Sequence, residues 1–531
     1  MKFSSKVLKC GLSPMRKFHP YAVAAEARGK KIYHLNIGQP DIETPKAYFE
    51  AVRHFDLPVL AYAPSPGIPE LIAAIQKYYD DLDMHFETGD ILITNGGSEA
   101  LQIAMNCILD DGDEILIPEP FYPNYNTMAY TCGAKIHPIP TSPHDGYHYA
   151  DRAKVEAEIN EHTRAIMVTN PGNPTGAVLT PEEMRMLVDV AKAHDLFIIG
   201  DEAYREFVYA GEPLQSMGQF DDAAENVIVI DTVSKRFSAC GARIGCMISR
   251  NKELMAQAMK YAQCRLSVPT LDQVAAAALY TVGPDYFAAV REEYKRRRDT
   301  VVNKLHEIPG VVCECPRGAF YIMAALPVDD ADAFQKWLLE EFEDNGDTVM
   351  FAPGEPFYAT PGKGKNEIRI AYVLKQADLE RAMDLLALRD HAAGELYQKL
   401  CRSFDPHSAA AAVAKMQELN LLDDAGFARR RAAELLRKRK SRRAILDDLH
   451  AKGIDRGAAA EAVEALFAQS EEDEEENPEL ANARALVERH YAAKLAQGKW
   501  QQVAAALARR GFSHSVIRQA LADAETEETE A

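Results

Sequence analysis

The sequence of 531 residues lacks a long apolar run, and its cysteines follow no regular pattern. No uninterrupted apolar stretch reaches the roughly 20 residues that cross a bilayer, and the first thirty residues hold no continuous apolar segment of the kind found in a secretory signal. Among the nine cysteines only Cys313 and Cys315 lie close together, which argues against a disulfide framework or a zinc site. These absences predict a cytoplasmic protein with reduced thiols and no metal centre.

The sequence also has no excess of basic residues. The chain has 60 Lys and Arg against 80 Asp and Glu, a formal net charge of -20. This balance excludes a protein that binds nucleic acid with its whole surface, but it allows a local basic patch. Hydrophobic residues at 47% and charged residues at 26% are typical of a globular protein, and the length allows about two to four domains with cores of their own.

Short apolar runs alternate with helical patterns between about residues 90 and 250. The runs expected to be strands are 91–94, 114–117, 135–139, 165–168, 196–199, 227–230 and 245–248, and a helix is expected at 181–194. The alternation predicts an α/β fold with a mostly parallel sheet covered by helices. Because ligands of such sheets bind beyond the carboxyl ends of the strands, the residues just after each run are candidates for function.

A lysine flanked by hydroxyl groups follows one of these runs. Lys235 comes five residues after the run 227–230, with Thr232 and Ser234 before it and Arg243 eight residues after it. A lysine amine forms imines with aldehydes, and hydroxyl and guanidinium groups bind phosphate. The stretch therefore suits a phosphorylated aldehyde, pyridoxal phosphate, although a lysine at a strand end is more often a solvated charge.

Other strand ends carry polar or aromatic groups. Gly97 and Ser98 lie in a glycine turn that opens a helix, where free N–H groups suit a phosphate. Tyr122 can stack on a flat heterocycle, and a turn rich in Pro and Gly holds the amide of Asn173 in a fixed place. Asp201 directly follows a buried strand, where a carboxylate is costly unless a group such as a protonated pyridine nitrogen pairs with it. Taken singly, each feature also fits an ordinary turn or core packing.

Together these motifs carry a family resemblance. Asn173-Pro174-Thr175-Gly176, Asp201-x-x-Tyr204, Ser234-Lys235 and Arg243, in this order and spacing, resemble the class I aminotransferases of the fold-type I pyridoxal-phosphate enzymes. The resemblance covers residues 1–388. It implies a large cofactor domain at about 46–285, a small α+β domain formed by 1–45 and 286–388, and a homodimer that acts on an amino acid and a 2-oxo acid.

The resemblance also implies roles for single residues. Lys235 is then the Schiff-base lysine, and Asp201 is the partner of the pyridine nitrogen. The other expected cofactor contacts are Tyr204 and Asn173 at the phenolic oxygen, Tyr122 on the ring, and Gly97, Ser98, Thr232, Ser234 and Arg243 at the phosphate. Tyr62 is expected to reach the phosphate of the neighbouring subunit. Gly38, Asn173 and Arg369 are expected to bind the substrate, with Gly38 and Arg369 at its α-carboxylate.

The substrate is less sharply defined. The phrases 33–41 and Gly318-Ala319-Phe320-Tyr321 resemble bacterial aspartate aminotransferases, which favours L-aspartate as donor and 2-oxoglutarate as acceptor. A dicarboxylic substrate needs a second cation, for which Arg265 and Arg16 are candidates. Two alternatives use the same fold: a carbon-sulfur lyase, and a ligand sensor in a regulatory protein. Such sensors usually carry an N-terminal winged helix, for which residues 1–30 are too short.

The sequence changes character after residue 388. Strands and most glycines disappear, and similar units recur around 395–406, 444–455 and 503–513, which predicts three tandem helical repeats with an acidic linker at 471–479. Residues 389–531 resemble the RecX family, regulators of the RecA recombinase filament, and the resemblance implies binding to RecA. The segment Arg429–Arg443 holds nine Lys or Arg against one Glu. It is a candidate contact to filament or DNA phosphates, or else a solvated helix face.

Two readings of the whole chain remain. It is either an aminotransferase with a RecX-like domain attached or chiefly a recombination regulator with an incidental enzyme half. A bifunctional protein and two neighbouring reading frames joined through a lost stop would both have this sequence.

Overall fold

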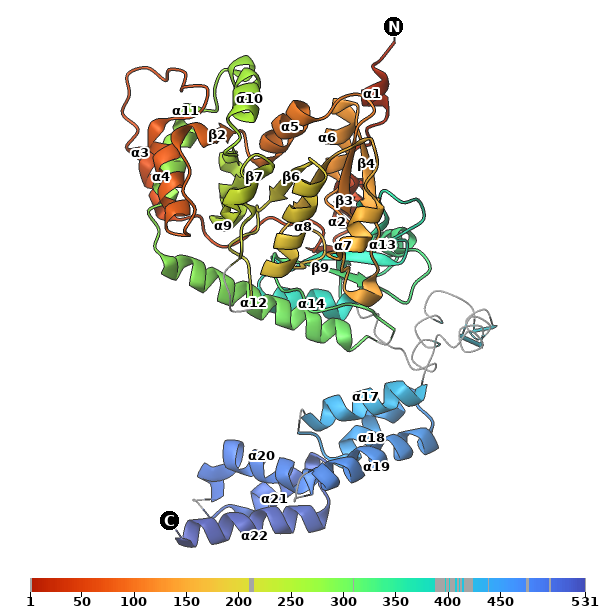
Figure 1. Cartoon of the computed structure of the whole chain (residues 1–531). Coiled ribbons are helices and arrows are strands. Elements are labelled where there is room, and N and C mark those ends of the chain that lie inside the picture. The colour runs from red at the N-terminus through yellow and green to blue at the C-terminus, as the bar shows by residue number, and fades with distance from the viewer. Residues whose placement is uncertain are drawn as a thin grey trace. The chain divides into compact units, whose positions relative to one another are not determined.

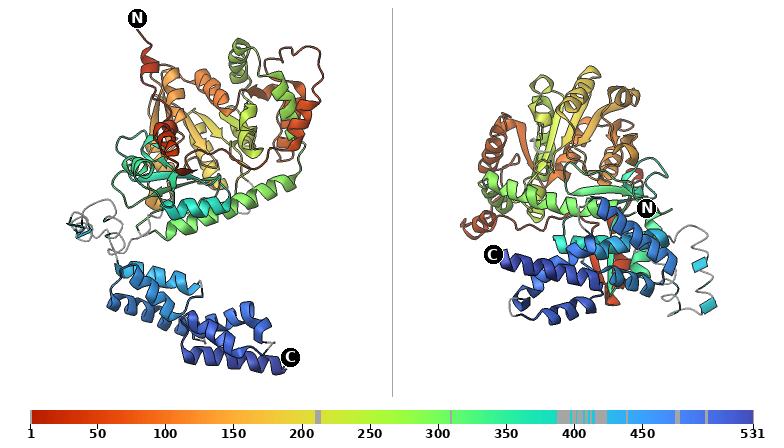
Figure 2. Two further views of the ribbon diagram at one scale, coloured as in Figure 1. Left: turned by 180° about the vertical axis from the view of Figure 1, so that it is seen from behind. Right: turned by 90° about the horizontal axis from the view of Figure 1, so that it is seen from below.

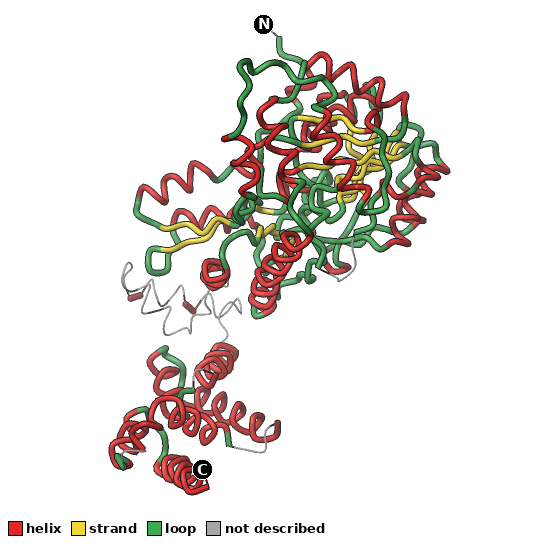
Figure 3. Tube along the Cα trace, turned by 90° about the vertical axis from the view of Figure 1, so that its left-hand side faces the viewer, coloured by secondary structure: helices red, strands yellow, loops and turns green. Residues whose placement is uncertain are grey.

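The computed structural model describes residues 2–209, 214–308, 310–386, 424–437, 439–473, 477–495 and 498–530, with a few isolated positions between 397 and 414. The chain divides into two compact units, Met1–Ala387 and Leu388–Ala531. The first unit combines strands and helices, whereas the described part of the second is helical (Figure 3). No helix in these described ranges is long and apolar enough to span a membrane.

A seven-stranded sheet forms the centre of the first unit (Figure 1). Its strands, in the order β2-β8-β7-β6-β5-β3-β4, are β2 (Ile91–Thr94), β8 (Gly245–Ile248), β7 (Val227–Thr232), β6 (Phe197–Asp201), β5 (Thr163–Thr169), β3 (Glu114–Pro118) and β4 (Lys135–Ile139). β8 is antiparallel to β2 and β7, and the other neighbours are parallel. The mostly parallel sheet and its seven strands are thus confirmed.

Both faces of the central part of this sheet are buried, which explains why the middle positions of its strands are mostly apolar. Consecutive residues point to opposite faces, so Ile198 packs into one apolar cluster and Ile199 into another. The first face is covered by α4 (Pro69–Asp80), α8 (Pro181–Ala193) and α11 (Thr270–Leu279). The second is covered by α5 (Gly97–Ile108), α6 (Asn124–Cys132) and α10 (Lys252–Arg265). The predicted helix at 181–194 is α8.

A separate apolar cluster lies around a smaller sheet. This smaller sheet consists of three antiparallel strands, β11 (Ala352–Pro353), β12 (Glu367–Ala371) and β9 (Tyr321–Ala325). A separate two-stranded sheet is formed by β1 (Lys31–His34), which pairs in parallel with β10 (Asp347–Met350). The long helix α12 (Pro284–His306) packs beside α14 (Gln376–Leu386), as Figures 1 and 2 show. The remaining helices are α1 (Ser5–Leu8), α2 (His19–Ala27), α3 (Lys46–Arg53), α7 (Arg152–Ala157), α9 (Val233–Arg236) and α13 (Ala331–Glu340).

The described part of the second unit, from residue 424 on, contains two groups of three helices, each with its own apolar core. The first group is α17 (Asp424–Arg437), α18 (Arg442–Ala451) and α19 (Arg456–Asp473), and the second is α20 (Pro478–Leu495), α21 (Trp500–Arg509) and α22 (His514–Glu530). They correspond to the second and third predicted repeats. The first repeat and the join at 387–391 fall almost wholly outside the described residues. Because α19 continues to Asp473, residues 471–473 of the predicted linker are helical instead.

Candidate active site

The lysine singled out in the sequence lies in α9, a single helical turn that directly follows β7. Thr232 caps α9, since its Oγ1 accepts a hydrogen bond from the N–H of Ser234 at 3.2 Å, and the two hydroxyl oxygens lie 2.8 Å apart. Lys235 Nζ donates to the carbonyl oxygen of Gly38 at 2.9 Å. The turn therefore presents two hydroxyl groups and one amine at the carboxyl edge of the sheet.

The glycine turn before α5 lies against this edge. Gly96 has a φ of +77°, and a Cβ added there would lie 2.2 Å from Arg243 Nη2. A Cβ on Gly97 would lie 3.8 Å from Thr232 Cβ. Arg243 donates to the carbonyl oxygens of Cys240 at 3.0 Å and Asn95 at 3.4 Å. The first turn of α5, which includes the exposed Ser98, thus meets a hydroxyl group and a guanidinium group, and this donor set suits a phosphate.

Asp201 ends β6 and is buried without a cation at ion-pair distance among the described residues. Its Oδ2 accepts a hydrogen bond from Tyr125 Oη at 2.6 Å, and its Oδ1 accepts one from the N–H of Ala203 at 3.2 Å. Burial raises the pKa of Asp201, and these two hydrogen bonds oppose that rise. A cationic ring nitrogen beside this carboxylate would supply the missing charge.

Arg369 is the complementary case, a buried cation without a carboxylate. It lies on β12 with a relative exposure of 3%. Its terminal nitrogens donate to Asn36 O at 2.6 Å and Asn173 Oδ1 at 3.1 Å, whereas Nε has no hydrogen-bond partner in the described structure. Burial lowers the pKa of Arg369. The guanidinium group lies 4.5 Å from the centre of the Tyr321 ring and therefore fits a carboxylate that enters beside this ring.

Tyrosine side chains fill the space between these charges. Tyr204 Oη and Tyr321 Oη lie 2.9 Å apart, and both rings are buried. Tyr122 Oη accepts a hydrogen bond from Asn124 Nδ2 at 2.7 Å, and burial raises the pKa of Tyr122. Tyr122 also packs edge-on against Tyr125 at 5.5 Å. These tyrosines thus lie among two buried groups that lack a partner of opposite charge in the described structure, the Asp201 carboxylate and the Arg369 guanidinium group.

Most of the residues predicted for the site lie close together in the structure, but Tyr62 and the two candidate arginines for a distal carboxylate do not. Tyr62 lies outside, with a relative exposure of 82%. Arg265, one candidate for a distal carboxylate, instead lies 3.5 Å from Glu99 and donates to Ile93 O at 3.1 Å. Arg16, the other candidate, is exposed and follows Met15, whose Sδ lies 3.4 Å from Arg369 Nη2. Of the two arginines, Arg16 therefore lies next in the chain to a residue that touches Arg369.

Sequence reasoning missed two tyrosines that the structure places at the centre of the site. Tyr125 stands in the same aromatic stretch as Tyr122, and Tyr321 ends the phrase that begins at Gly318. The stretches were visible, but the pattern did not show which ring would face Asp201 or Tyr204. Asn36, whose carbonyl oxygen binds Arg369, gave no sequence signal of its own.

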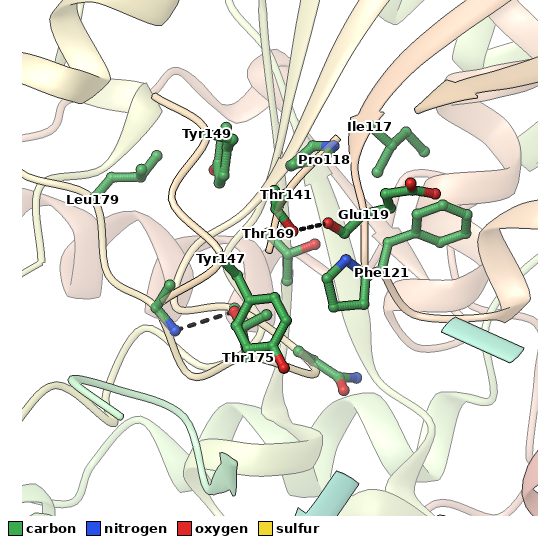
Figure 4. A pocket seen from close by; sticks show the side chains of 14 residues that line it. Ile117, Pro118, Glu119, Phe121, Thr141, Tyr147, Tyr149, Thr169, Thr175 and Leu179 are labelled. Carbon is green, nitrogen blue, oxygen red and sulfur yellow. Dashed lines mark hydrogen bonds between the residues drawn. The ribbon is translucent and has the colours of Figure 1, made fainter. Parts of the chain in front are cut away.

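A small cavity of about 30 Å³ (Figure 4) has Asn173 among its lining residues. Its walls include Tyr147, Thr169 and Thr141, and Thr141 donates a hydrogen bond to the carbonyl oxygen of Glu119. This volume holds about one or two water molecules and no cofactor. The cavity therefore adjoins the candidate site without forming part of it.

Comparisons with known proteins agree with this geometry. Residues 30–386 match the family model for aminotransferase class I and II, and residues 477–521 match that for the third three-helix domain of RecX. The aspartate aminotransferase of Bacillus subtilis is 31% identical over 396 residues, which cover 72% of this chain and 98% of that protein. The probable aspartate/prephenate aminotransferase of Aquifex aeolicus is 31% identical over 386 residues, or 71% of this chain and 95% of that protein.

Solved structures give the same result. A single mutant of Thermus thermophilus aspartate aminotransferase superimposes with a TM-score of 0.67 at 28% identity, covering 73% of this chain and 99% of that one. The alanine aminotransferase of Pyrococcus furiosus gives a TM-score of 0.67 at 30% identity with the same coverage. Both matches place the seven-stranded sheet and the strands around Arg369 in one known fold.

Proposed function

The chain belongs to the class I and II aminotransferases, and on that premise we propose that it moves an amino group from an L-amino acid, with L-aspartate favoured, to a 2-oxo acid such as 2-oxoglutarate. Its family uses pyridoxal phosphate, and the residues present fit that cofactor. The observation that carries the proposal is the pair of unpaired buried charges, Asp201 and Arg369, on either side of the Lys235 site.

We assign the cofactor contacts accordingly. When bound, pyridoxal phosphate supplies an aldehyde that takes up the amino group and a ring that withdraws electrons from the substrate's α-carbon. Its phosphate group would be held by Gly97, Ser98, Thr232, Ser234 and Arg243, its ring by Tyr122, and its phenolic oxygen by Tyr204 and Asn173. Asp201 would keep a proton on the ring nitrogen, because a buried carboxylate is stabilised by that positive charge.

The remaining residues act on the substrate. Lys235 would bind the aldehyde and, as a free amine, move the proton of the substrate's α-carbon. Arg369 would hold the α-carboxylate with two nitrogens of its planar fork, and Gly38 leaves room for that carboxylate. We assign the distal carboxylate of L-aspartate to Arg16, because Arg265 already lies against Glu99.

A homodimer and a division of the enzyme unit complete the proposal. The exposed apolar side chains of Leu57, Val59 and Leu60 lie beside Tyr62 in one loop, and apolar groups clustered in this way are typical of subunit interfaces. We propose that Tyr62 reaches the phosphate site of the neighbouring subunit. The separate apolar cores support a large domain at about 46–285 and a small domain formed by 1–45 and 286–388.

The visible spectrum of the purified protein with pyridoxal phosphate, recorded before and after addition of L-aspartate, tests the enzyme proposal. We expect the band of the lysine-bound cofactor to be replaced by that of pyridoxamine phosphate, and we expect no such band in the Lys235→Ala control. A spectrum that L-aspartate leaves unchanged while L-alanine converts it would exclude aspartate as the donor. Continuous release of oxo acid without an amino acceptor would instead identify a carbon-sulfur lyase.

For the helical unit we propose binding to the RecA filament through the basic segment Arg429–Arg443. The match to RecX supports the proposal, and so does the exposure of Arg429, Lys440 and Arg443. Arg431 has a structural role instead, since it forms two contacts of 2.8 and 2.9 Å with the Asp448 carboxylate.

Inhibition of RecA strand exchange by the full-length protein tests this second function. Replacement of Arg429, Lys440 and Arg443 by alanine should weaken inhibition, whereas Lys235→Ala should leave it unchanged. Salt titration of DNA binding by the same variants separates contact with DNA from contact with protein, because each lost phosphate contact lowers the salt dependence by about one unit. Full inhibition by the triple variant would refute the assigned surface.

A further inference from the structure

We propose that Tyr321 is a positioning residue of the amino-transfer site, whose hydroxyl group donates to Tyr204 Oη and so turns the Tyr204 hydrogen toward the phenolic oxygen of the cofactor. The proposal rests on the function assigned to Tyr204 above. It adds a residue that no motif marked, and it gives that residue a role that can be separated from packing.

Tyr321 lies close to three other residues of the site, Tyr204, Arg369 and Gly38. Tyr321 is the first residue of β9, has a relative exposure of 3%, and lies edge-on to Tyr204 with 5.4 Å between ring centres. Its hydroxyl oxygen lies 2.9 Å from that of Tyr204, and the guanidinium group of Arg369 lies over its ring at 4.5 Å. A Cβ added to Gly38 would lie 1.8 Å from its hydroxyl oxygen. Gly38 in turn accepts a hydrogen bond from Lys235.

The direction of the bond between the two tyrosines follows from counting hydrogens. Each phenol has one, and burial raises the pKa of Tyr204 well above its usual value, so the Tyr204 hydroxyl group keeps its hydrogen at ordinary pH. In the described structure, Tyr204 Oη is the only atom that forms a hydrogen bond with the Tyr321 hydroxyl group. If Tyr204 donates its hydrogen to an anionic oxygen, Tyr321 must donate to Tyr204.

A hydrogen bond from Tyr321 to Tyr204 strengthens the next bond, the one that Tyr204 would donate to the phenolic oxygen. A hydroxyl group that accepts a hydrogen bond becomes a better donor itself, because each bond polarises the next. The charged and titratable groups that face Tyr204 are Tyr321, Arg369, Asp201 and Lys235. Of these, Tyr321 alone forms a hydrogen bond with the Tyr204 hydroxyl group in the described structure. Tyr321 therefore controls which way the Tyr204 hydrogen points.

The test is a pH titration of the visible band of the holoenzyme with Tyr321→Phe. This substitution keeps the ring under Arg369 and removes only the hydroxyl group. We expect the midpoint to move upward by about a few tenths of a pH unit, because one hydrogen bond strengthens the next by only about 10–30% and the phenolic oxygen becomes more basic when its donor weakens. The value of kcat should fall, while KM for the amino acid should stay within about twofold because Arg369 keeps its partners.

Two sets of variants separate this role from general packing. Tyr294→Phe is the matched control, since Tyr294 is fully buried in the same apolar cluster and its hydroxyl group has no hydrogen-bond partner in the described structure. It should not move the midpoint. Tyr204→Phe should move it, and adding Tyr321→Phe to that variant should move it no further, because Tyr321 acts through Tyr204.

The outcomes distinguish this proposal from the proposed function. An unchanged midpoint in Tyr321→Phe, or an equal further shift when Tyr321→Phe is added to Tyr204→Phe, would overturn the role of Tyr321 alone. If Tyr204→Phe itself leaves the midpoint unchanged, the role of Tyr204 fails and this proposal fails with it. A shift in both single variants that does not add in the double variant supports both.

Discussion

Asp231 and Arg236, which flank Lys235 in the sequence, form a buried ion pair, and a substitution of Arg236 tests how much this pair stabilises the site. Asp231 directly precedes Thr232, and Arg236 directly follows Lys235, so the pair closes the turn that carries the two hydroxyl groups and the amine. The side chains are 1% and 0% exposed. Asp231 also accepts hydrogen bonds from Tyr79 Oη at 2.8 Å and from the N–H of Thr232 at 2.7 Å. The change we consider is Arg236→Met.

The expected cost follows from the burial of both partners. Arg236→Met leaves the Asp231 carboxylate buried with two neutral donors and no cation, and breaking a buried pair in this way costs about 3–5 kcal/mol. Methionine occupies a similar volume, so little of this cost comes from a cavity. Asp231→Asn added to Arg236→Met removes the uncompensated charge and should recover about half or more of the loss. We also expect Arg236→Met to bind pyridoxal phosphate more weakly, because the turn before Lys235 loses its anchor.

Urea unfolding of the holoenzyme, followed by far-UV circular dichroism at one fixed cofactor concentration, measures these free energies. The paired surface residues Lys304 and Asp384, 2.8 Å apart, supply the control. Lys304→Met should cost less than about 1 kcal/mol because the pair is exposed. A cost below about 1 kcal/mol for Arg236→Met, or a double variant less stable than the single one, would refute the reasoning.

Three further predictions concern single side chains. Arg369→Lys should lower kcat/KM for L-aspartate by about 10–100-fold in steady-state assays, because a lysine cannot offer the two parallel hydrogen bonds of the fork; an unchanged value would exclude Arg369 from substrate binding. Gly38→Ala should weaken amino acid binding in a spectral titration, because the new Cβ would fall on the Tyr321 hydroxyl group; normal affinity would contradict the close contact. The pKa of Asp222 is lowered from 3.8 to about 2 by hydrogen bonds from Arg185 and Lys192, so its contribution to stability is present above pH 4 and is lost as the pH falls through that interval. Asp222→Asn should therefore make the free energy of unfolding depend less on pH below about pH 4. An unchanged pH dependence in that interval would refute this assignment.

The fold could be predicted from local sequence because its strands are short, apolar and buried on both faces. The runs at 91–94 and 227–230 have no charged residue that would suit a solvated helix, and both are strands in the structure. The candidate site followed from the same pattern, since Asp201 ends a strand and Asn173 and Lys235 stand a few residues beyond one. Parallel strands bring such ends together without any knowledge of side-chain packing.

Contacts between side chains from distant segments of the chain could not be predicted in this way. Tyr321, Arg369 and Gly38 come from segments far apart in the sequence. The local pattern of apolar and polar residues does not predict that these three residues are in contact. Arg265 illustrates the same limit, because its side chain at the end of α10 faces Glu99 on α5 rather than the substrate. The acidic run at 471–479 was expected to be a linker from its charge, but α19 extends into it, since glutamate has a high helix propensity.

The strongest argument for the site is a difference between charges that lie at similar depth. Asp231 and Arg236 are buried with each other, as charges in a protein interior usually are. Asp201 and Arg369, buried to nearly the same degree, have no partner of opposite charge at ion-pair distance in the described structure, and burial opposes the charged form of each. An enzyme that must bind a cationic ring nitrogen and a carboxylate needs such unpaired groups, and it loses stability until those ligands arrive. We therefore expect the ligands to bind at these two unpaired charges, while the paired charges Asp231 and Arg236 hold the turn that presents Lys235.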